Sequence, residues 1–108
     1  MGAPLPGPLA AYYSATKKYD IDAMLAPFAE GAVVKDEGRE RRGLEAIREW
    51  MKETIRTYRF TLEPTDVARK NGTVLVTTVV AGTFSGSPIT LRYAFTLDRD
   101  RIARLEIS

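Results

Sequence analysis

Residues 20–50 read DIDAMLAPFAEGAVVKDEGRERRGLEAIREW, and the spacing of their apolar side chains changes twice. Asp20 is suited to cap a short helix, because its carboxylate can accept a hydrogen bond from the free amides of a first helical turn. Pro27 must kink this helix or end it early, and we expect Gly31 to end it. Residues 32–36 then have the spacing of a strand, followed by a polar turn at residues 37–40. The apolar stripe of the short helix is Ile21, Met24, Leu25 and Phe28.

Two further helices are predicted, one after the quoted strand at residues 44–57 and one near the start at residues 8–18. The later helix has apolar side chains at helical spacing and three acid–base pairs, three residues apart, on its exposed side. In the earlier helix Pro8 suits the first turn, and Lys17 and Lys18 suit the last turn near the negative end of the helix dipole. The buried face of the later helix is Leu44, Ile47, Met51, Ile55 and Tyr58.

From residue 58 the apolar spacing switches to a period of two, which is typical of strands. Asn71-Gly72 is a strong hairpin signal, and two more turns follow at residues 85–88 and 98–100. Gly82, within the β-branched segment 73–84, indicates a bulge or bend that curves the sheet. These elements predict an α+β fold, with three helices on one face of a strongly curved antiparallel sheet. We assign residues 8–108 to one domain and residues 1–7 to a flexible N-terminal segment.

The composition excludes several classes of function. The 108 residues include no cysteine and no histidine, which excludes disulfides, zinc–thiolate sites, cysteine nucleophiles and imidazole catalysis. A net charge of +2 without a basic block argues against nucleic acid, and no apolar run approaches the roughly 20 residues of a membrane span. No phosphate-binding loop, dinucleotide fingerprint or metal motif is present, so we expect neither cofactor nor metal. The lack of cysteine fits a cytoplasmic location.

Asp36 is the acidic residue whose position in the pattern stands out. Continuing the strand period from Val34 places the Asp36 side chain on the same face as Val34, where it can point into an apolar interior. Alternatively, the carboxylate bonds the turn amides around Gly38, and the residues alone slightly favour this second interpretation. Tyr12 raises a similar question, because an aromatic residue on a helix stripe is usually core, whereas a buried phenol needs a partner for its hydroxyl. The same two interpretations, core residue or cavity wall, apply to Trp50, Tyr58, Phe60, Tyr93 and Phe95.

The order of elements, together with several residues, resembles a known superfamily. Tyr12, residues 20–22, FAEGAVVKDEG at 28–38 and RGLEAIREW at 42–50 are similar to the nuclear transport factor 2-like superfamily, also called cystatin-like. Its SnoaL-like and ketosteroid isomerase-like branches are the most similar, and the resemblance covers nearly the whole chain. It implies a cone of three helices and a bent sheet around a pocket, often dimerised through the sheet.

The resemblance also implies roles for individual residues. Ketosteroid isomerase removes a proton beside a carbonyl with an aspartate, and it stabilises the enolate with a tyrosine and a protonated aspartic acid. Counting from Asp22 without a gap, Asp36 falls on the base position and Tyr12 on the tyrosine position. The third position falls near Arg92 or Tyr93, and neither is a carboxylic acid. The Asp-Arg-Asp set of the epoxide-hydrolase branch would have to be residues 98–100, a predicted turn, so we reject that match.

We therefore predict a pocket protein for a small, largely apolar molecule with a carbonyl group, acting as a cofactor-free isomerase, cyclase or lyase. In this hypothesis Asp36 is the general base and Tyr12 donates to the oxyanion, while Trp50, Tyr58, Phe60 and Tyr93 bind the substrate. The alternative is a non-catalytic ligand-binding or protein-interaction domain of the same fold. We also expect a homodimer through the sheet face that bears Thr77, Val79, Thr90 and Arg92.

Overall fold

The computed structural model describes residues 5–108, which form three helices and six strands. Residues 1–4 of the predicted flexible segment lie outside the described residues. The helices are α1 (Gly7–Lys17), α2 (Ile21–Leu25) and α3 (Leu44–Tyr58). The strands are β1 (Phe28–Asp36), β2 (Arg39–Arg42), β3 (Thr61–Lys70), β4 (Thr73–Ala81), β5 (Ile89–Asp98) and β6 (Arg101–Ile107).

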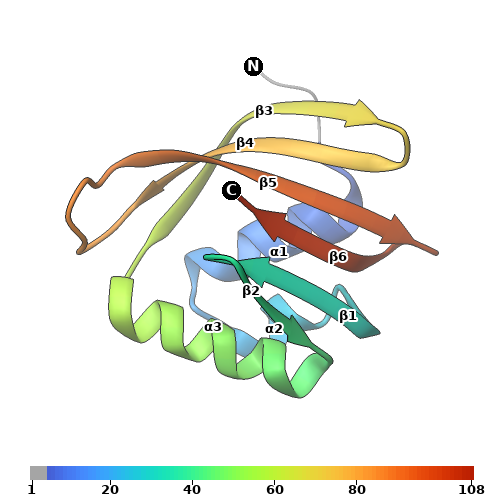
Figure 1. The fold of residues 1–108 in the computed structure, drawn as a ribbon, viewed down its shortest axis with the longest axis horizontal. Helices are drawn as coiled ribbons and strands as arrows, with labels where there is room; N and C mark the ends of the chain where they lie inside the picture. Colours follow the sequence, from blue (N-terminus) through green and yellow to red (C-terminus); the bar gives the residue numbers. More distant parts are fainter. Residues whose placement is uncertain (1–4) are drawn as a thin grey trace.

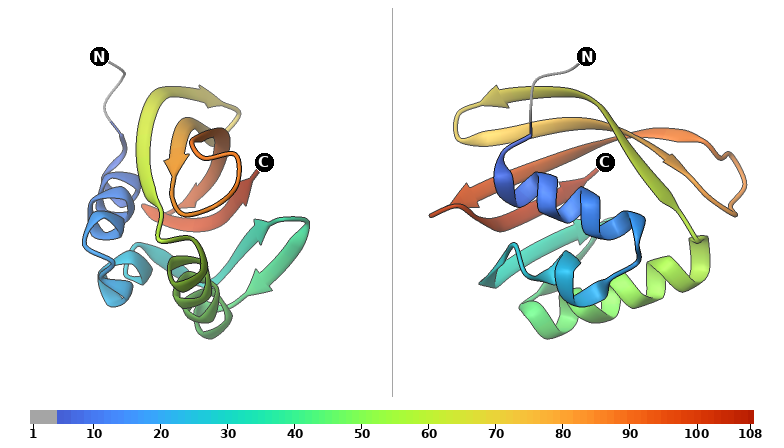
Figure 2. Two further views of the ribbon diagram at one scale, coloured as in Figure 1. Left: turned by 90° about the vertical axis from the view of Figure 1, so that its left-hand side faces the viewer. Right: turned by 180° about the vertical axis from the view of Figure 1, so that it is seen from behind.

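All six strands belong to one curved sheet, whose order is β2-β1-β6-β5-β4-β3. The helices cover one of its faces, as Figure 1 and the view from behind in Figure 2 show. The predicted α+β fold is confirmed, with one difference in the pairing of the strands. Strand β1 pairs with β6 in parallel, whereas all other neighbours are antiparallel. The N-terminal half therefore supplies two strands of the sheet as well as its helices.

The predicted end of α2 and start of β1 were wrong. Asp20 does cap α2, because its Oδ1 accepts a hydrogen bond from the Ala23 amide at 3.2 Å. However, the helix ends at Leu25, and β1 starts at Phe28 instead of residue 32. Pro27 cannot continue the helix, and its carbonyl instead accepts a hydrogen bond from the Ile102 amide of β6 at 2.8 Å. Pairing with β6 thus extends β1 toward its N-terminal side.

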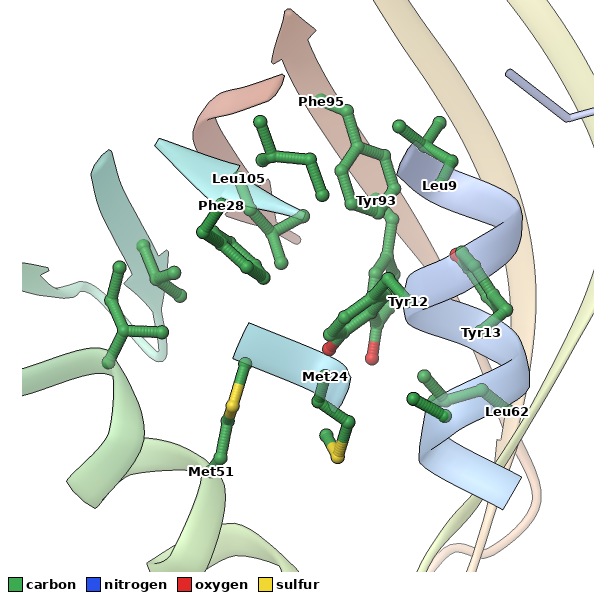
Figure 3. Close-up of a cluster of buried hydrophobic side chains, with 14 of the residues drawn as sticks. Leu9, Tyr12, Tyr13, Met24, Phe28, Met51, Leu62, Tyr93, Phe95 and Leu105 are labelled. Atoms are coloured by element: carbon green, nitrogen blue, oxygen red, sulfur yellow. The ribbon is translucent and has the colours of Figure 1, made fainter. Parts of the chain in front are cut away.

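The hydrophobic core lies between the helices and the concave face of the sheet. Figure 3 shows part of this core. Leu9, Ile47, Met51, Phe95, Ile102 and Leu105 have no exposed surface. Burial of each such side chain contributes on the order of 1.5–3 kcal/mol, so this cluster stabilises the packing of helices on the sheet. None of the helices within residues 5–108 is long and apolar enough to cross a membrane.

The β4–β5 hairpin reaches beyond the rest of the sheet to the C-terminal end of α3. Strand β4 ends at Ala81, and Gly82 forms a bend so close to α3 that an added Cβ would lie 2.5 Å from the Tyr58 carbonyl oxygen. That oxygen accepts a hydrogen bond from the Thr83 amide at 2.8 Å. Helix α3 itself ends because Arg59 adopts a left-handed conformation, with a φ of 46°. The bend predicted at Gly82 thus anchors the hairpin to α3.

Candidate functional site

A cavity of about 220 Å³ opens between the C-terminal half of α3, the concave sheet and the β4–β5 hairpin. The ends of these elements meet on the left of Figure 1, and the left view of Figure 2 looks onto that end of the molecule. A cavity of about 150 Å³ can hold benzene, so this one has room for a substituted ring. Helix α1, strand β1 and strand β6 complete its wall.

All six residues that we assigned to the site from the sequence line this cavity, whereas Phe95, also considered as a wall residue, lies in the core. They are Tyr12, Asp36, Trp50, Tyr58, Phe60 and Tyr93. Seven further lining residues, most of them apolar, were not predicted from the sequence. They are Glu37, Thr54, Val80, Phe84, Ile89, Leu91 and Ile107. The alternation of residues 89–93 was a signal for Ile89 and Leu91, which share a strand face with Tyr93, but no local pattern marks Glu37 or Thr54.

Asp36 is the last residue of β1, and its half-buried carboxylate contacts α3. Its Oδ2 accepts a hydrogen bond from the indole Nε1 of Trp50 at 3.0 Å. Within residues 5–108 this is the one hydrogen bond to the carboxylate, and no turn amide near Gly38 donates to it. The structure therefore contradicts the interpretation of Asp36 as a turn-capping carboxylate. One oxygen is held in place by Trp50, while the other is free to accept a proton.

Tyr12 lies on α1 with only 1% of its surface exposed. Its ring packs edge-on against Phe28 and Phe95, with centroid distances of 5.7 and 6.0 Å. The Tyr12 hydroxyl has no hydrogen-bond partner in residues 5–108. Every fully enclosed polar side-chain atom in these residues does have a partner, so the Tyr12 hydroxyl is not fully enclosed. The Tyr12 hydroxyl is therefore accessible from the cavity. Burial raises the pKa of this phenol, and the neighbouring Tyr13 and Asp36 raise it further, so it stays protonated.

Tyr93 of β5 presents a second phenol to the same cavity. It is 4% exposed, and its hydroxyl also has no hydrogen-bond partner in the described part of the chain. Burial, followed by the proximity of Tyr12 and Tyr13, raises the pKa of Tyr93 well above its usual value. In Figure 3 the hydroxyls of Tyr12 and Tyr93 point in the same direction. From the sequence we predicted Tyr93 only as a wall residue, and its hydroxyl was not expected beside that of Tyr12.

The neighbouring Tyr13 has a different environment. Its hydroxyl forms a hydrogen bond with Oγ1 of Thr78 at 2.7 Å, and Thr78 is fully buried. Burial raises the pKa of Tyr13, and the hydrogen bond with Thr78 lowers it by less. Tyr13 is thus part of the closed core and does not line the cavity.

The mouth of the cavity contains Glu37, Tyr58 and Phe84. The rings of Tyr58 and Phe84 meet edge-on at 5.7 Å, which fixes the β4–β5 hairpin against α3. The charge of Glu37 is the main cause that raises the pKa of Tyr58, followed by burial. Within residues 5–108 no group of three or more acidic, histidine or cysteine side chains could hold a metal ion.

Comparisons with known proteins find the same architecture in several solved structures. A protein from Sinorhizobium meliloti, proposed to be a polyketide cyclase, is 39% identical, with a TM-score of 0.93 over 96% of this chain and 95% of that one. A second proposed polyketide cyclase, from Xanthomonas campestris, is 26% identical, with a TM-score of 0.80 over 94% and 86% of the two chains. A protein from Catenulispora acidiphila with a ketosteroid isomerase-like fold is 19% identical, with a TM-score of 0.83 over 97% and 86%.

A search of curated proteins gives no match. The family model described as the SnoaL-like domain matches residues 9–105, which is nearly the whole chain and includes every lining residue of the cavity except Ile107. The superfamily suggested by the sequence is therefore confirmed. The chain belongs to the SnoaL-like domain family.

Proposed function

We propose that this protein binds a small, largely apolar molecule with a carbonyl group and moves a proton at the carbon beside that group. The observation that carries the proposal is the meeting of the Asp36 carboxylate with the unpartnered phenols of Tyr12 and Tyr93 in one largely apolar cavity. A base and a pair of hydrogen-bond donors are the groups that enolisation requires. The residues themselves supply both, so we propose that the reaction needs no cofactor.

Asp36 acts as the general base in this proposal. Its free oxygen takes the proton from the carbon beside the carbonyl. The C–H electron pair then forms a double bond to the carbonyl carbon, and the carbonyl π electrons move onto the oxygen of the resulting enolate. The Trp50 indole keeps the carboxylate oriented, because it holds the other oxygen at 3.0 Å. In an isomerase the proton then returns from Asp36 to a different carbon. In a cyclase the enolate carbon instead forms a bond to a second carbonyl carbon, whose π electrons move onto its oxygen, and that oxygen takes the proton from Asp36.

Tyr12 and Tyr93 stabilise the negative charge that develops on the carbonyl oxygen. Both remain protonated at neutral pH because burial raises the pKa of each phenol, so both can donate hydrogen bonds. A pair of phenols would then do the work that a tyrosine and a protonated aspartic acid perform in ketosteroid isomerase. Removal of one such donor typically costs about 100- to 1000-fold in turnover.

The relationship to the Sinorhizobium meliloti protein supports a cyclase rather than an isomerase as the more specific activity. That protein is proposed to be a polyketide cyclase and is 39% identical over almost the whole chain. A polyketide has carbonyl groups on alternate carbons, so its C–H groups are acidic enough for a carboxylate base. An enolate held by Tyr12 and Tyr93 could attack a second carbonyl of the same molecule.

The test uses a small β,γ-unsaturated ketone, cyclohex-3-enone, whose isomerisation to the conjugated ketone is followed by ultraviolet absorbance. We expect turnover by the wild-type protein and a loss of about 100- to 10,000-fold in Asp36→Asn, the range for a general base. Asparagine can still accept the Trp50 hydrogen bond, so the thermal melting temperature should change little. Equal rates in the two proteins would refute the role of Asp36. Binding of the ketone without turnover in either protein would favour a binding domain.

We also propose that two copies associate through the sheet face that carries no helix. Thr77 and Val79 of β4 lie opposite Arg92 and Thr90 of β5, respectively, in the strand register. All four side chains are on the face away from the buried Thr78 and Tyr93. Light scattering at micromolar concentration should give twice the chain mass, and a species of 12.0 kDa would contradict the proposal.

A further inference from the structure

The cavity has negative charge at its mouth and no positive charge on its wall. Asp36 and Glu37 are its two acidic lining residues, and no lysine or arginine of residues 5–108 lines it. Glu37 follows the end of β1 in a tight turn, where its φ is 54°. The proposed reaction accounts for Asp36 but assigns no role to Glu37.

Three basic side chains of the neighbouring elements have other partners. Lys35 lies 3.8 Å from Glu106, and Arg104 lies 3.2 Å from Glu40. The guanidinium of Arg59, directly after α3, lies over the ring of Tyr19 at 5.8 Å. These basic groups are therefore directed to other contacts, and the charge at the mouth is not neutralised by the lining of the cavity.

Helix α3 adds to the negative potential at the mouth. Its last residue, Tyr58, lines the cavity, so the C-terminal end of this 15-residue helix lies there. The C-terminal end of a helix has about half a negative elementary charge, which favours a cation nearby. The charge of Glu37 already acts on this spot, because it is the main cause that raises the pKa of Tyr58.

The same end of the cavity is lined by aromatic rings. Trp50 and Tyr58 of α3 and Phe84 of the hairpin contribute to the wall, and the Tyr58 and Phe84 rings are in edge-to-face contact. The faces of such rings attract ammonium groups, most strongly where water is excluded. Rings beside an uncompensated carboxylate would be a poor site for an anion and would give a neutral group no electrostatic advantage.

We propose that the substrate carries an ammonium group, which Glu37 and the rings of Tyr58, Trp50 and Phe84 hold at the mouth. The carbonyl end then lies deeper, at the hydroxyls of Tyr12 and Tyr93. This inference rests on the proposed function for the orientation of the substrate. It makes Glu37 a specificity residue, which selects the substrate by charge without taking part in the proton transfer.

The experiment compares three phenols of matched size that differ in the charge at one end. Tyramine ends in an ammonium group, 4-propylphenol in a methyl group and 3-(4-hydroxyphenyl)propanoate in a carboxylate. We expect calorimetry at pH 7 to give tyramine an affinity about tenfold above that of 4-propylphenol, with the propanoate weakest. In Glu37→Gln the advantage of tyramine should fall to about twofold, while the affinity for 4-propylphenol stays unchanged.

A control variant separates Glu37 from the overall charge of the protein. Glu63→Gln removes one acidic group from the exposed surface of β3, outside the cavity, and should leave the tyramine preference intact. Equal affinity of the wild-type protein for tyramine and 4-propylphenol would overturn the ammonium inference and leave the proposed function standing. The same preference in Glu37→Gln as in wild type would also overturn it.

If the proposed function is wrong, so that the cavity does not bind a phenol oxygen, none of the three phenols should bind. The ammonium inference is then decided by benzyltrimethylammonium, which has a cationic group and a ring but no hydroxyl. Binding that Glu37→Gln weakens at least about fivefold would support a cation site without enolate chemistry. Absence of binding to the wild-type protein would overturn the inference as well.

Discussion

Helix α1 carries two adjacent tyrosines that belong to two different regions of the interior. Around Tyr13 the region is closed, and the hydroxyl has a buried partner in Thr78 at 2.7 Å. Around Tyr12 the region is open to the cavity, and the hydroxyl, like that of Tyr93, has no protein partner within residues 5–108. The two rings are nearly perpendicular, 87° apart with centroids at 5.6 Å, so neighbouring positions on one helix point into both regions.

The difference between the regions shows where polar groups stabilise the fold and where they are available to a ligand. A hydrogen bond within a closed core contributes roughly 0.5–1.5 kcal/mol to stability. A hydroxyl that faces a cavity contributes little to stability but can bind a ligand without first giving up a protein partner. Tyr12, Tyr93 and the free oxygen of Asp36 are all of this second kind, whereas Tyr13 and Thr78 are of the first kind.

Alkaline pH should destabilise both regions, and this is the largest effect that we expect on stability. The pKa values of Tyr12, Tyr13 and Tyr93 are raised in the folded protein, first by burial in each case. Above pH ~10 the unfolded chain loses these three protons while the folded chain retains them. The free energy of unfolding should then fall by up to about 1.4 kcal/mol per pH unit for each tyrosine, or about 4 kcal/mol per unit for the three.

Urea unfolding at pH 8, 9, 10 and 11 measures this loss. Little change is expected below pH ~10, and replacement of any one of the three tyrosines by phenylalanine should reduce the slope above it by about a third. Tyr58 makes a suitable control, because it is only half-buried, so Tyr58→Phe should change the slope less. If Tyr12→Phe leaves the slope as in wild type, the Tyr12 phenol ionises in the folded protein and cannot be the neutral donor of the proposed mechanism.

Much of the fold could be predicted because its signals are local. The Asn71-Gly72 hairpin, the alternation along β5 and the cap of α2 at Asp20 each depend on a few neighbouring residues. Strand β2 was missed because its sequence, RERR, has no apolar alternation. It exists through its pairing with β1, in which Arg42 lies opposite Val33. The parallel pairing of β1 with β6 likewise depends on contacts between the two ends of the chain.

The candidate site could be predicted as a set of residues but not as an arrangement. Asp36 was singled out by the strand pattern and Tyr12 by its place on a helix stripe, and the resemblance supplied their roles. Trp50, Tyr58, Phe60 and Tyr93 were found as aromatic residues suited to the core or to a cavity wall. The hydrogen bond of Trp50 to Asp36 depends on how α3 packs on β1, which spacing within either element does not determine. The position of the Tyr93 hydroxyl beside that of Tyr12 depends on the curvature of the sheet over α1.

The comparison of the two tyrosines is tested most directly by removing one hydroxyl at a time. Tyr12→Phe should leave the free energy of unfolding at pH 7 unchanged, because no protein hydrogen bond is lost. Tyr13→Phe should lower it by roughly 0.5–1.5 kcal/mol, because Thr78 loses a partner in the closed core. The order should reverse for the binding of 4-nitrophenolate, a mimic of the enolate. Tyr12→Phe should weaken that binding by about 1.5–3 kcal/mol, or roughly 10- to 150-fold, and Tyr13→Phe should not change it.

This binding is best measured by absorbance in an Asp36→Asn background, because the neutral amide replaces the protonated carboxylic acid that exists when the enolate does. Tyr93→Phe in the same background should weaken binding as Tyr12→Phe does, and the double variant should show whether the two hydroxyls bind one oxygen. If they do, the loss of binding free energy in the double variant should differ from the sum of the two single losses, because donors to a shared atom are not independent. Unchanged binding in Tyr12→Phe, together with a loss of stability like that of Tyr13→Phe, would assign both tyrosines to the closed core. The distinction between the two regions, and with it the role of Tyr12, would then be wrong.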